Sequence, residues 1–386
     1  MDGRFAGGRR CPLSGTLIYA LLTFAVATTV YQLTALIACL RQLAIGATPV
    51  RNPQPISILK PVRGLDPDFY EAIRSHASQD YPAPFEILFG AADPDDPSLV
   101  EVERLRQDFP HIDIRVIHSL TPAPNAKVGV LIDLAREAQY PLLLVNDSDI
   151  FVPQGYLKRV SAPLDDDKIG IVTALYRATS YSLPGRWEAL GIAIDFAQSV
   201  LVAPLVGIRE FGLGATLVFR AADLRAIGGF PVIADYLADD YQLAKHITRL
   251  GKRSYMSDVV VETSIGDDSW AGVWQHQIRW ARTIRVSRGD GYLGLPITHT
   301  GLWIFASLAC GAWSLAASLT ILRWVTALVG GVLVLRSPLA ARGFWLAPLW
   351  DLWAFAVWIA GLTGSTVVWR DGVLKLAKDG KIFRQV

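Results

Sequence analysis

The sequence Leu144-Val145-Asn146-Asp147-Ser148-Asp149 ends an apolar run with two acidic residues spaced by one position. The apolar run predicts a buried strand, and the acids then lie at its carboxyl end. In an open α/β sheet, ligands bind at that end of the strands. Two carboxylates there can hold a divalent cation, which typically also binds a substrate diphosphate. A solvated turn after the strand is the alternative, because Asp-x-Asp is common in turns.

Strand-like and helix-like patterns alternate around this stretch, from residue 51 to residue 298. We expect strands at 56–59, 86–89, 113–117, 141–145, 169–175, 215–219 and 259–265. We expect helices at 68–79, 98–109, 127–137, 240–250 and 270–286. This alternation predicts an α/β fold, with a largely parallel sheet covered by helices on both faces.

Both ends of the chain and one internal run are strongly apolar. Residues 11–40 contain no charged side chain and exceed the roughly 20 residues that a transmembrane helix needs. We expect an uncleaved N-terminal transmembrane helix there; a cleaved signal peptide, with a shorter apolar core, is the alternative. The internal run 189–208 is interrupted by Asp195 and Pro204. It predicts either a helix packed in the domain or a helix resting on a membrane surface.

Residues 299–369 are predicted to form a C-terminal membrane region of two or three segments. The runs 300–322 and 343–369 are each long enough to span a bilayer, and Asp351 is the only charge in them. The apolar run 324–335 is short for a full span and fits a re-entrant or interfacial piece. Residues 370–386 form a tail with more Lys and Arg than Asp, which indicates a cytoplasmic location.

The central region contains no cysteine, because Cys11, Cys39 and Cys310 all lie at or inside the apolar ends. It therefore forms no disulfide, in agreement with a reducing compartment. The formal net charge of +2 favours no particular partner. We expect no nucleic acid partner, and the sequence leaves the oligomeric state open.

Several polar residues follow expected strands or begin expected helices. Asp93 follows the second strand and could bind a nucleotide base or ribose; an Asx turn between prolines is the alternative. Lys127 begins a helix, where it could meet a nucleotide phosphate or remain a solvated surface lysine. Asp239 and Asp240 begin another helix, which Asp239 can cap. Asp240 can be a general base, because neighbouring acids raise each other's pKa.

The expected helix 270–286 has a basic edge, on which Arg279, Arg282 and Arg285 recur every three residues. Arginine forks bind phosphates well. The alternative is a helix that lies on anionic lipid headgroups. The sequence contains neither a Walker A motif nor a His-Glu-x-x-His motif. The candidates for chemistry are therefore the carboxylates and this basic helix.

Taken in chain order, the candidate residues resemble those of a membrane-bound family 2-type glycosyltransferase with a GT-A fold. They are Lys60-Pro61, Asp93, Lys127, Asp147-Ser148-Asp149, Asp239-Asp240-Tyr241 and Arg279-Trp280. The chain is most similar to the ceramide glucosyltransferase family (glycosyltransferase family 21), which also resembles bacterial hopanoid-biosynthesis glycosyltransferases. The resemblance implies an integral protein of a bacterial inner membrane. Its GT-A catalytic domain, residues 51–298, would be cytoplasmic.

The resemblance also implies a role for each matched residue. Asp93 matches the aspartate that binds uridine. Asp149, together with Asp147, matches the aspartate that binds a divalent metal (Mg²⁺ or Mn²⁺) and the nucleotide diphosphate. Asp240 matches the catalytic base. The expected donor-binding residues are Lys60, Asp93, Lys127, Asp147, Arg279 and Trp280.

Arg279 and Trp280 match the end of the family's (Gln/Arg)-x-x-Arg-Trp motif, near the diphosphate and the acceptor. This chain departs from the motif at its first position, which is His276. The implied reaction moves one sugar from a UDP-sugar to a hydroxyl of a lipid, either ceramide or a hopanoid polyol. A single displacement would invert the anomeric carbon.

Three other functions compete with this interpretation. A polyprenyl-phosphate glycosyltransferase has an acceptor that is already an anion, so Asp240 would be less critical. A non-catalytic membrane scaffold or sugar-nucleotide sensor would keep the fold without the reaction. A processive polysaccharide synthase usually has more membrane spans than the two or three expected at this C-terminus.

Overall fold

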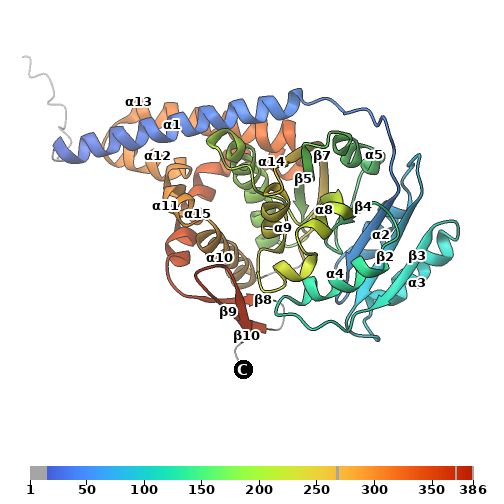
Figure 1. The fold of residues 1–386 in the computed structure, drawn as a ribbon. Coiled ribbons are helices and arrows are strands. Elements are labelled where there is room, and N and C mark those ends of the chain that lie inside the picture. The colour runs from blue at the N-terminus through green and yellow to red at the C-terminus, as the bar shows by residue number, and fades with distance from the viewer. Residues whose placement is uncertain (1–14, 267–268, 370–371, 385–386) are drawn as a thin grey trace, which may run out of the picture.

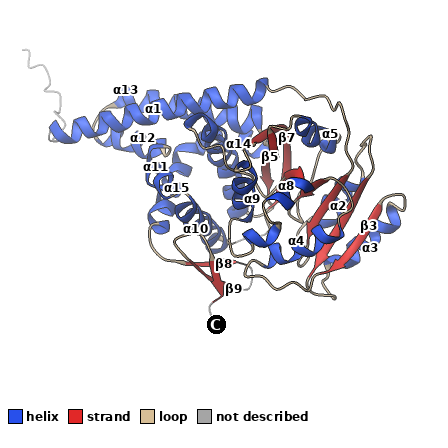
Figure 2. Cartoon of the chain, viewed as in Figure 1, coloured by secondary structure: helices blue, strands red, loops and turns tan. Residues whose placement is uncertain are grey.

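The computed structural model describes residues 15–266, 269–369 and 372–384. A central seven-stranded sheet lies beside a group of long apolar helices, and a three-stranded sheet lies near the C-terminus (Figure 1). Figure 2 distinguishes the strands of the two sheets, in red, from the helices, in blue. The predicted α/β fold with apolar helices at both ends is confirmed.

The central sheet has the strand order β3-β2-β1-β4-β6-β5-β7. β6 is antiparallel to both β4 and β5, and all other pairs are parallel. The carboxyl ends of β1, β2, β3 and β4 therefore meet at one edge. The strands are β1 Ile56–Pro61, β2 Phe85–Ala91, β3 Asp113–His118, β4 Leu142–Val145, β5 Ile169–Thr179, β6 Leu217–Arg220 and β7 Arg253–Ser264. Each expected strand is present, although β5 and β7 are longer than expected.

Helices cover both faces of this sheet. One face packs against α2 Phe69–Ala77, α3 Ser98–Asp108 and α5 Tyr156–Ser161. The other face packs against α4 Ala126–Glu137, α8 Ala221–Ala226 and α9 Asp239–Thr248. In β4, Leu142 and Leu144 belong to the first core, whereas Leu143 and Val145 belong to the second. Because successive strand residues point to opposite faces, this unbroken apolar run fits a strand buried on both sides.

Four helices in the described residues are long and apolar enough to cross a membrane: Tyr19–Ala44, Leu183–Val206, Trp313–Val334 and Pro338–Gly361. They support association with a membrane. They include α1 Gly15–Ala44, α6 Leu183–Gly191, α7 Ala197–Val202, α13 Trp313–Leu328, α14 Pro338–Gly343 and α15 Ala347–Gly361. The Leu183–Val206 helix is 61% buried against protein, compared with 22% for Tyr19–Ala44. It therefore fits the expected helix packed in the domain.

The C-terminal helices begin and end at positions that the charge pattern did not predict. The run 300–322 breaks after α12 Thr300–Ala309, where Gly311 adopts a left-handed φ of +71°. The next helix passes through Arg323, so 324–335 is not a separate piece. Arg323 Nη2 bonds Asp351 Oδ1 at 2.7 Å, and both side chains are fully buried. A buried charge persists there because its partner neutralises it.

The chain after α15 forms a sheet and not the end of a membrane segment. β8 Thr366–Trp369, β9 Gly372–Leu376 and β10 Ile382–Arg384 are antiparallel neighbours. Ile382 N–H donates to Asp235 O at 2.7 Å, next to the segment that leads into α9. The expected basic tail is therefore a packed part of the protein. Residues 370–371 and 385–386 of that tail, like residues 11–14 of the expected N-terminal helix, lie outside the described residues.

Candidate active site

The loop after β4 is fixed from the neighbouring strands. Lys60, fully buried in β1, donates from Nζ to Asp147 O at 3.0 Å. Asn146 Nδ2 donates to Ala215 O, just before β6, at 2.7 Å. Burial lowers the pKa of Lys60 to about 7, although Asp149 and Asp147 oppose this shift. Lys60 therefore supports the loop that carries the two acids, which is a different contact from the donor contact that the resemblance implies.

Asp149 is held at the edge of the sheet by β7. Its carboxylate accepts a hydrogen bond from the Thr263 hydroxyl. Burial, followed by the negative charge of Asp147, raises the pKa of Asp149 to about 6. A carboxylate with a raised pKa beside a second carboxylate is stabilised by any cation that binds between them. This electrostatic situation favours a cation at the Asp147–Asp149 pair.

Lys127 joins two of the predicted acidic positions. Its Nζ lies 2.6 Å from Asp147 Oδ1 and 3.3 Å from Asp239 Oδ2. Burial alone would lower the pKa of Lys127. The negative charges of Asp147 and Asp239 together raise it by more than burial lowers it, so the net shift is upward. Lys127 therefore stays protonated. Asp239 was expected to cap α9, but its carboxylate pairs with Lys127 and the cap position is Ala238.

Asp240 lies beside this cluster and is fixed by two backbone donors. Gly214 N–H donates to Asp240 Oδ2 at 2.9 Å, and Tyr241 N–H donates to Oδ1 at 2.7 Å. A Cβ added to Gly214 would lie 3.3 Å from Asp147 Oδ2 and 3.5 Å from Asp240 Oδ2. The two carboxylates thus approach the same glycine. Burial and the adjacent Asp239 raise the pKa of Asp240 to about 6, against the opposing effect of Lys127.

The basic edge of α10 Trp270–Ser287 divides into two parts. Arg282 Nε donates to Thr363 O at 3.0 Å, and Arg285 Nη2 donates to Gly364 O at 2.6 Å. These two arginines tie α10 to the turn after α15. The Arg279 side chain makes no hydrogen bond or ion pair within the described residues. Of the three arginines, Arg279 is therefore the one available to a phosphate.

Arg279 and Trp280 have different surroundings. Burial lowers the pKa of Arg279, and the negative charges of Glu188 and Asp147 oppose this shift. The Trp280 ring packs on Phe196, with ring centroids 5.3 Å apart, and on His276, at 4.9 Å. Trp280 therefore faces the Leu183–Val206 helix.

Asp93 is exposed in the turn after β2, at the same sheet edge. Its Oδ1 accepts from Asp95 N–H at 2.9 Å, which is the Asx turn considered as the alternative. No contact in the described residues joins Asp93 to the acidic cluster. The structure thus brings together Lys60, Lys127, Asp147, Asp149, Asp240 and Arg279, and leaves Asp93 beside them.

Two further residues, Tyr176 and Glu188, were not among the candidates predicted from the sequence. Burial raises the pKa of Tyr176 strongly, and the negative charges of Asp240, Glu188 and Asp147 add to this upward shift. Tyr176 lies inside β5 and no sequence pattern identifies it. Glu188 could have been noticed, because it is a lone acid immediately before the apolar run 189–208.

The donor set fits a metal that a nucleotide diphosphate shares. The described residues contain no group of three or more His, Cys, Asp or Glu side chains that could hold a metal ion by themselves. Mg²⁺ is usually bound through one or two carboxylates plus substrate phosphates. Asp147 and Asp149 provide these two hard oxygen ligands. Asp149 is the less committed of the two, because Asp147 Oδ1 already pairs with Lys127.

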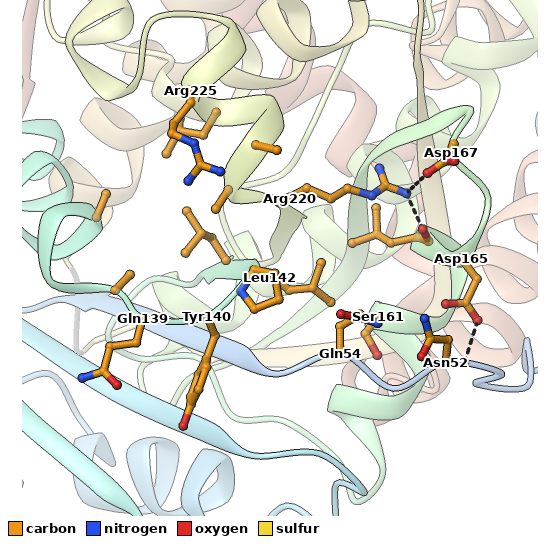
Figure 3. A pocket seen from close by; sticks show the side chains of 18 of the residues that line it. Asn52, Gln54, Gln139, Tyr140, Leu142, Ser161, Asp165, Asp167, Arg220 and Arg225 are labelled. Carbon is orange, nitrogen blue, oxygen red and sulfur yellow. Dashed lines mark hydrogen bonds and ion pairs between the residues drawn. The ribbon is translucent and has the colours of Figure 1, made fainter.

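A cleft of about 820 Å³ lies at the opposite end of β4 (Figure 3). Leu142, Arg220 and Arg225 are among the residues that line it. Arg220 is occupied there, since its Nη1 donates to Ile169 O at 2.8 Å. None of the predicted site residues lines this cleft. We therefore locate the candidate site at the carboxyl ends of the strands and not in the cleft.

Comparison with known proteins identifies the family. A family model described as glycosyl transferase family 21 matches residues 18–382. Ceramide glucosyltransferase 3 of Caenorhabditis elegans is 25% identical over 374 residues, which cover 85% of this chain and 74% of that protein. Ceramide glucosyltransferase 1 of the same organism is 28% identical over 205 residues, covering 52% of this chain and 44% of that protein. The matched region is thus less than half of the latter relative.

Among solved structures, a mannosyltransferase from Pyrobaculum calidifontis in complex with GDP-Man and Mn²⁺ has a TM-score of 0.56 to this chain. The match covers 89% of this chain and 97% of the mannosyltransferase, at 18% sequence identity. At that identity the likeness concerns the fold, which is the GT-A-like glycosyltransferase fold that the sequence predicted.

Proposed function

The chain belongs to glycosyl transferase family 21, and on this basis we propose that it is a membrane glycosyltransferase that moves one sugar from a UDP-sugar to a hydroxyl of a lipid. The observation that carries the proposal is the position of Asp240. Its carboxylate is fixed by two backbone N–H groups next to Asp147, at the edge of the sheet where ligands bind.

Asp240 is the general base in this proposal. A base with a pKa of about 6 is deprotonated at neutral pH and still accepts a proton readily. It takes the proton of the acceptor hydroxyl, whose oxygen then forms a bond to the anomeric carbon of the sugar. The bond between that carbon and the diphosphate oxygen breaks on the opposite face. UDP leaves, and the configuration is inverted.

Arg279 and Lys127 are the cations assigned to the leaving diphosphate. Arg279 is uncommitted, and Lys127 stays protonated between Asp147 and Asp239. Asp149 and Asp147 would hold a divalent cation, Mg²⁺ or Mn²⁺, which supplies positive charge to the departing diphosphate. Asp93 is proposed to bind uridine from its place at the same sheet edge.

The acceptor is proposed to arrive from the membrane side. A buried apolar core joins Leu175 of β5 to α1, α7, α13 and α15, so the apolar helices pack directly on the catalytic domain. Trp280, beside Arg279, contacts Phe196 of the helix that belongs to this core. The similarity to ceramide glucosyltransferases favours ceramide, and a hopanoid polyol is the second candidate.

We also propose an arrangement in the membrane. The N-terminal helix and the C-terminal helices up to the end of α15 at Gly361 would anchor the chain in a bacterial inner membrane. The domain at 51–298 and the tail at 370–386 would face the cytoplasm, where nucleotide sugars are made. The apolar helices Tyr19–Ala44, Trp313–Val334 and Pro338–Gly361 support the anchoring.

The experiment that tests this function uses membranes containing the protein. They are incubated with UDP-glucose, UDP-GlcNAc or UDP-galactose and with ceramide, a hopanoid polyol or a polyprenyl phosphate. Mass spectrometry should find one added sugar on a hydroxyl lipid, and EDTA should abolish the product. Product formed on polyprenyl phosphate alone would favour the alternative enzyme. Undiminished transfer in EDTA would contradict the metal assignment.

A further inference from the structure

Glu188 is a fully buried carboxylate that the proposed reaction does not use. It lies on α6 and faces α10. Its Oε1 accepts from His276 Nδ1 and from Gln277 Nε2, each at 2.6 Å. Its Oε2 is buried and has no hydrogen-bond partner among the described residues. Glu188 therefore ties α6 to α10 through one oxygen and leaves the other without a donor.

A buried carboxylate oxygen without a donor is energetically costly, so the arrangement points to a donor that arrives in another state. Arg279 is well placed to be that donor. It follows His276 by three residues, and residues at that spacing lie on the same face of a helix. Its side chain has no hydrogen bond in the described part of the chain. Among the charges that act on its pKa, that of Glu188 is the largest.

We propose that Glu188 is a positioning residue for Arg279. When the nucleotide diphosphate binds, Glu188 Oε2 accepts from one edge of the Arg279 guanidinium. The guanidinium has five N–H donors in a rigid fork, so its other edge remains available to the phosphate oxygens. Glu188 thereby orients Arg279 toward the Asp147 side of the site. This inference rests on the proposed function, because it assumes that the ligand is a nucleoside diphosphate.

The same arrangement explains the role of His276, which occupies the motif position where the chain departs from its family: it is a hydrogen-bond donor to Glu188. His276 Nδ1 donates to Glu188 Oε1, and Gln277 shares that oxygen. A side-chain amide at position 276 could make the same donation. The essential feature is then the charge of Glu188, and the identity of its donor matters less.

The test is a double-mutant cycle between Glu188 and Arg279, with UDP affinity measured by calorimetry in the presence of Mn²⁺. Glu188→Gln keeps an oxygen for His276 and Gln277 but removes the charge. It should weaken UDP binding at least ~10-fold in the wild-type background, the scale of a hydrogen bond to a charged group. In the Arg279→Ala background it should change UDP affinity by less than ~2-fold, because coupled residues are not additive.

Two control variants separate positioning from simple tethering of α10. His276→Gln keeps the Glu188 charge and should change UDP affinity less than ~2-fold. Glu86 is a second fully buried carboxylate, paired with Arg115 on β3 and remote from the site. Glu86→Gln should lower the Tm, and any effect on UDP affinity should be the same with and without Arg279.

The outcomes distinguish this inference from the proposed function. Equal weakening by Glu188→Gln in both backgrounds, or no weakening in either, would overturn the inference. A Glu188→Gln protein that does not fold would be replaced by Glu188→Asp, which keeps the charge at a shorter reach and should show partial weakening that also depends on Arg279. Sugar transfer is measured in parallel. A coupled cycle without any transfer would count against the proposed function alone, and a wild type that does not bind UDP would overturn both.

Discussion

Asp239 and Asp240 are neighbours in sequence, but their carboxylates have different partners. Asp239 pairs with Lys127, whereas Asp240 is held by the backbone of Gly214 and Tyr241. Adjacent helical residues point about 100° apart, so neither can replace the other. We expect Asp240→Asn to lower sugar transfer by ~10² or more, the scale of general-base removal, while UDP affinity is retained. Asp239→Asn should cost less.

This pair is checked by measuring UDP affinity and transfer to lipid for both variants. Near wild-type transfer by Asp240→Asn would mean that the base lies elsewhere. An acceptor that is already an anion, such as a polyprenyl phosphate, would then be the better interpretation.

The raised pKa of Asp240 predicts the pH dependence of the reaction. The base acts only when it is deprotonated, so kcat/KM should fall as the pH drops through about 6 and level off above it. Asp239→Asn removes a neighbouring negative charge that raises this pKa, so the acidic limb should move to lower pH. The profile is measured at saturating metal, because Asp149 titrates in the same range. An unchanged limb in Asp239→Asn would contradict the assignment of Asp240.

At the residue scale, most of the polar side chains that follow a strand or begin a helix lie together in the structure, whereas Asp93 forms an Asx turn apart from them. The side chains that converge are those of Asp147, Asp149, Asp240 and Lys127. Sequence reasoning failed for Glu188, whose contacts with His276 depend on the packing of α6 against α10. Contacts between elements far apart in the sequence depend on tertiary structure, which periodicity does not encode.

At the element scale, α10 shows how the spacing of charges can mislead. Its arginines recur at helical spacing, but Arg282 and Arg285 bind backbone carbonyls in the turn after α15. We expect Arg279→Ala to weaken UDP binding at least ~10-fold, as for loss of a charged hydrogen bond. Arg285→Ala should leave UDP affinity within ~2-fold and lower the Tm. Calorimetry measures UDP affinity and thermal unfolding measures the Tm of both variants. Equal losses of UDP affinity would mean that Arg279 and Arg285 both bind phosphate, as the spacing of the arginines suggested.

Residues 366–384 are an element whose character the composition concealed. Their basic charges suggested a solvated tail, but Leu374, Leu376 and Ile382 form a buried cluster with Leu237, just before α9. The alternating burial of β9 extends over only five residues, which is too short to outweigh the basic charges as a sequence pattern. The segment that leads to Asp239 and Asp240 is therefore buttressed by the C-terminus.

At the scale of the whole molecule, the alternation of strands and helices predicted the α/β fold, because long periodic segments determine element type, and the resemblance to a known family supplied the GT-A assignment. The limits of the C-terminal helices did not follow. In the sequence, the charge of Arg323 suggests the end of a membrane span. In the structure, Asp351 on another helix neutralises that charge, and the helix continues through Arg323. Intramembrane charges have to be paired before their cost can be judged, and the pairing is a property of the folded molecule.

The proposed arrangement in the membrane makes a prediction about labelling. Leu120 is 88% exposed in the loop after β3. A Leu120→Cys protein in intact cells should resist an impermeant thiol reagent and react after permeabilisation. The unsubstituted protein measures the background from Cys11, Cys39 and Cys310. Ready labelling in intact cells would mean that the domain faces the other side of the membrane.

The most direct test of inverting transfer to a lipid hydroxyl is the anomeric configuration of the product. Purified protein in liposomes is supplied with Mn²⁺, an α-linked UDP-sugar and the hydroxyl lipid identified by the substrate panel, and the glycolipid is analysed by NMR. A single displacement with Asp240 as base predicts a β-linked sugar on a hydroxyl oxygen, absent from the Asp240→Asn reaction. An α-linked product, or a sugar attached through a phosphate, would contradict it.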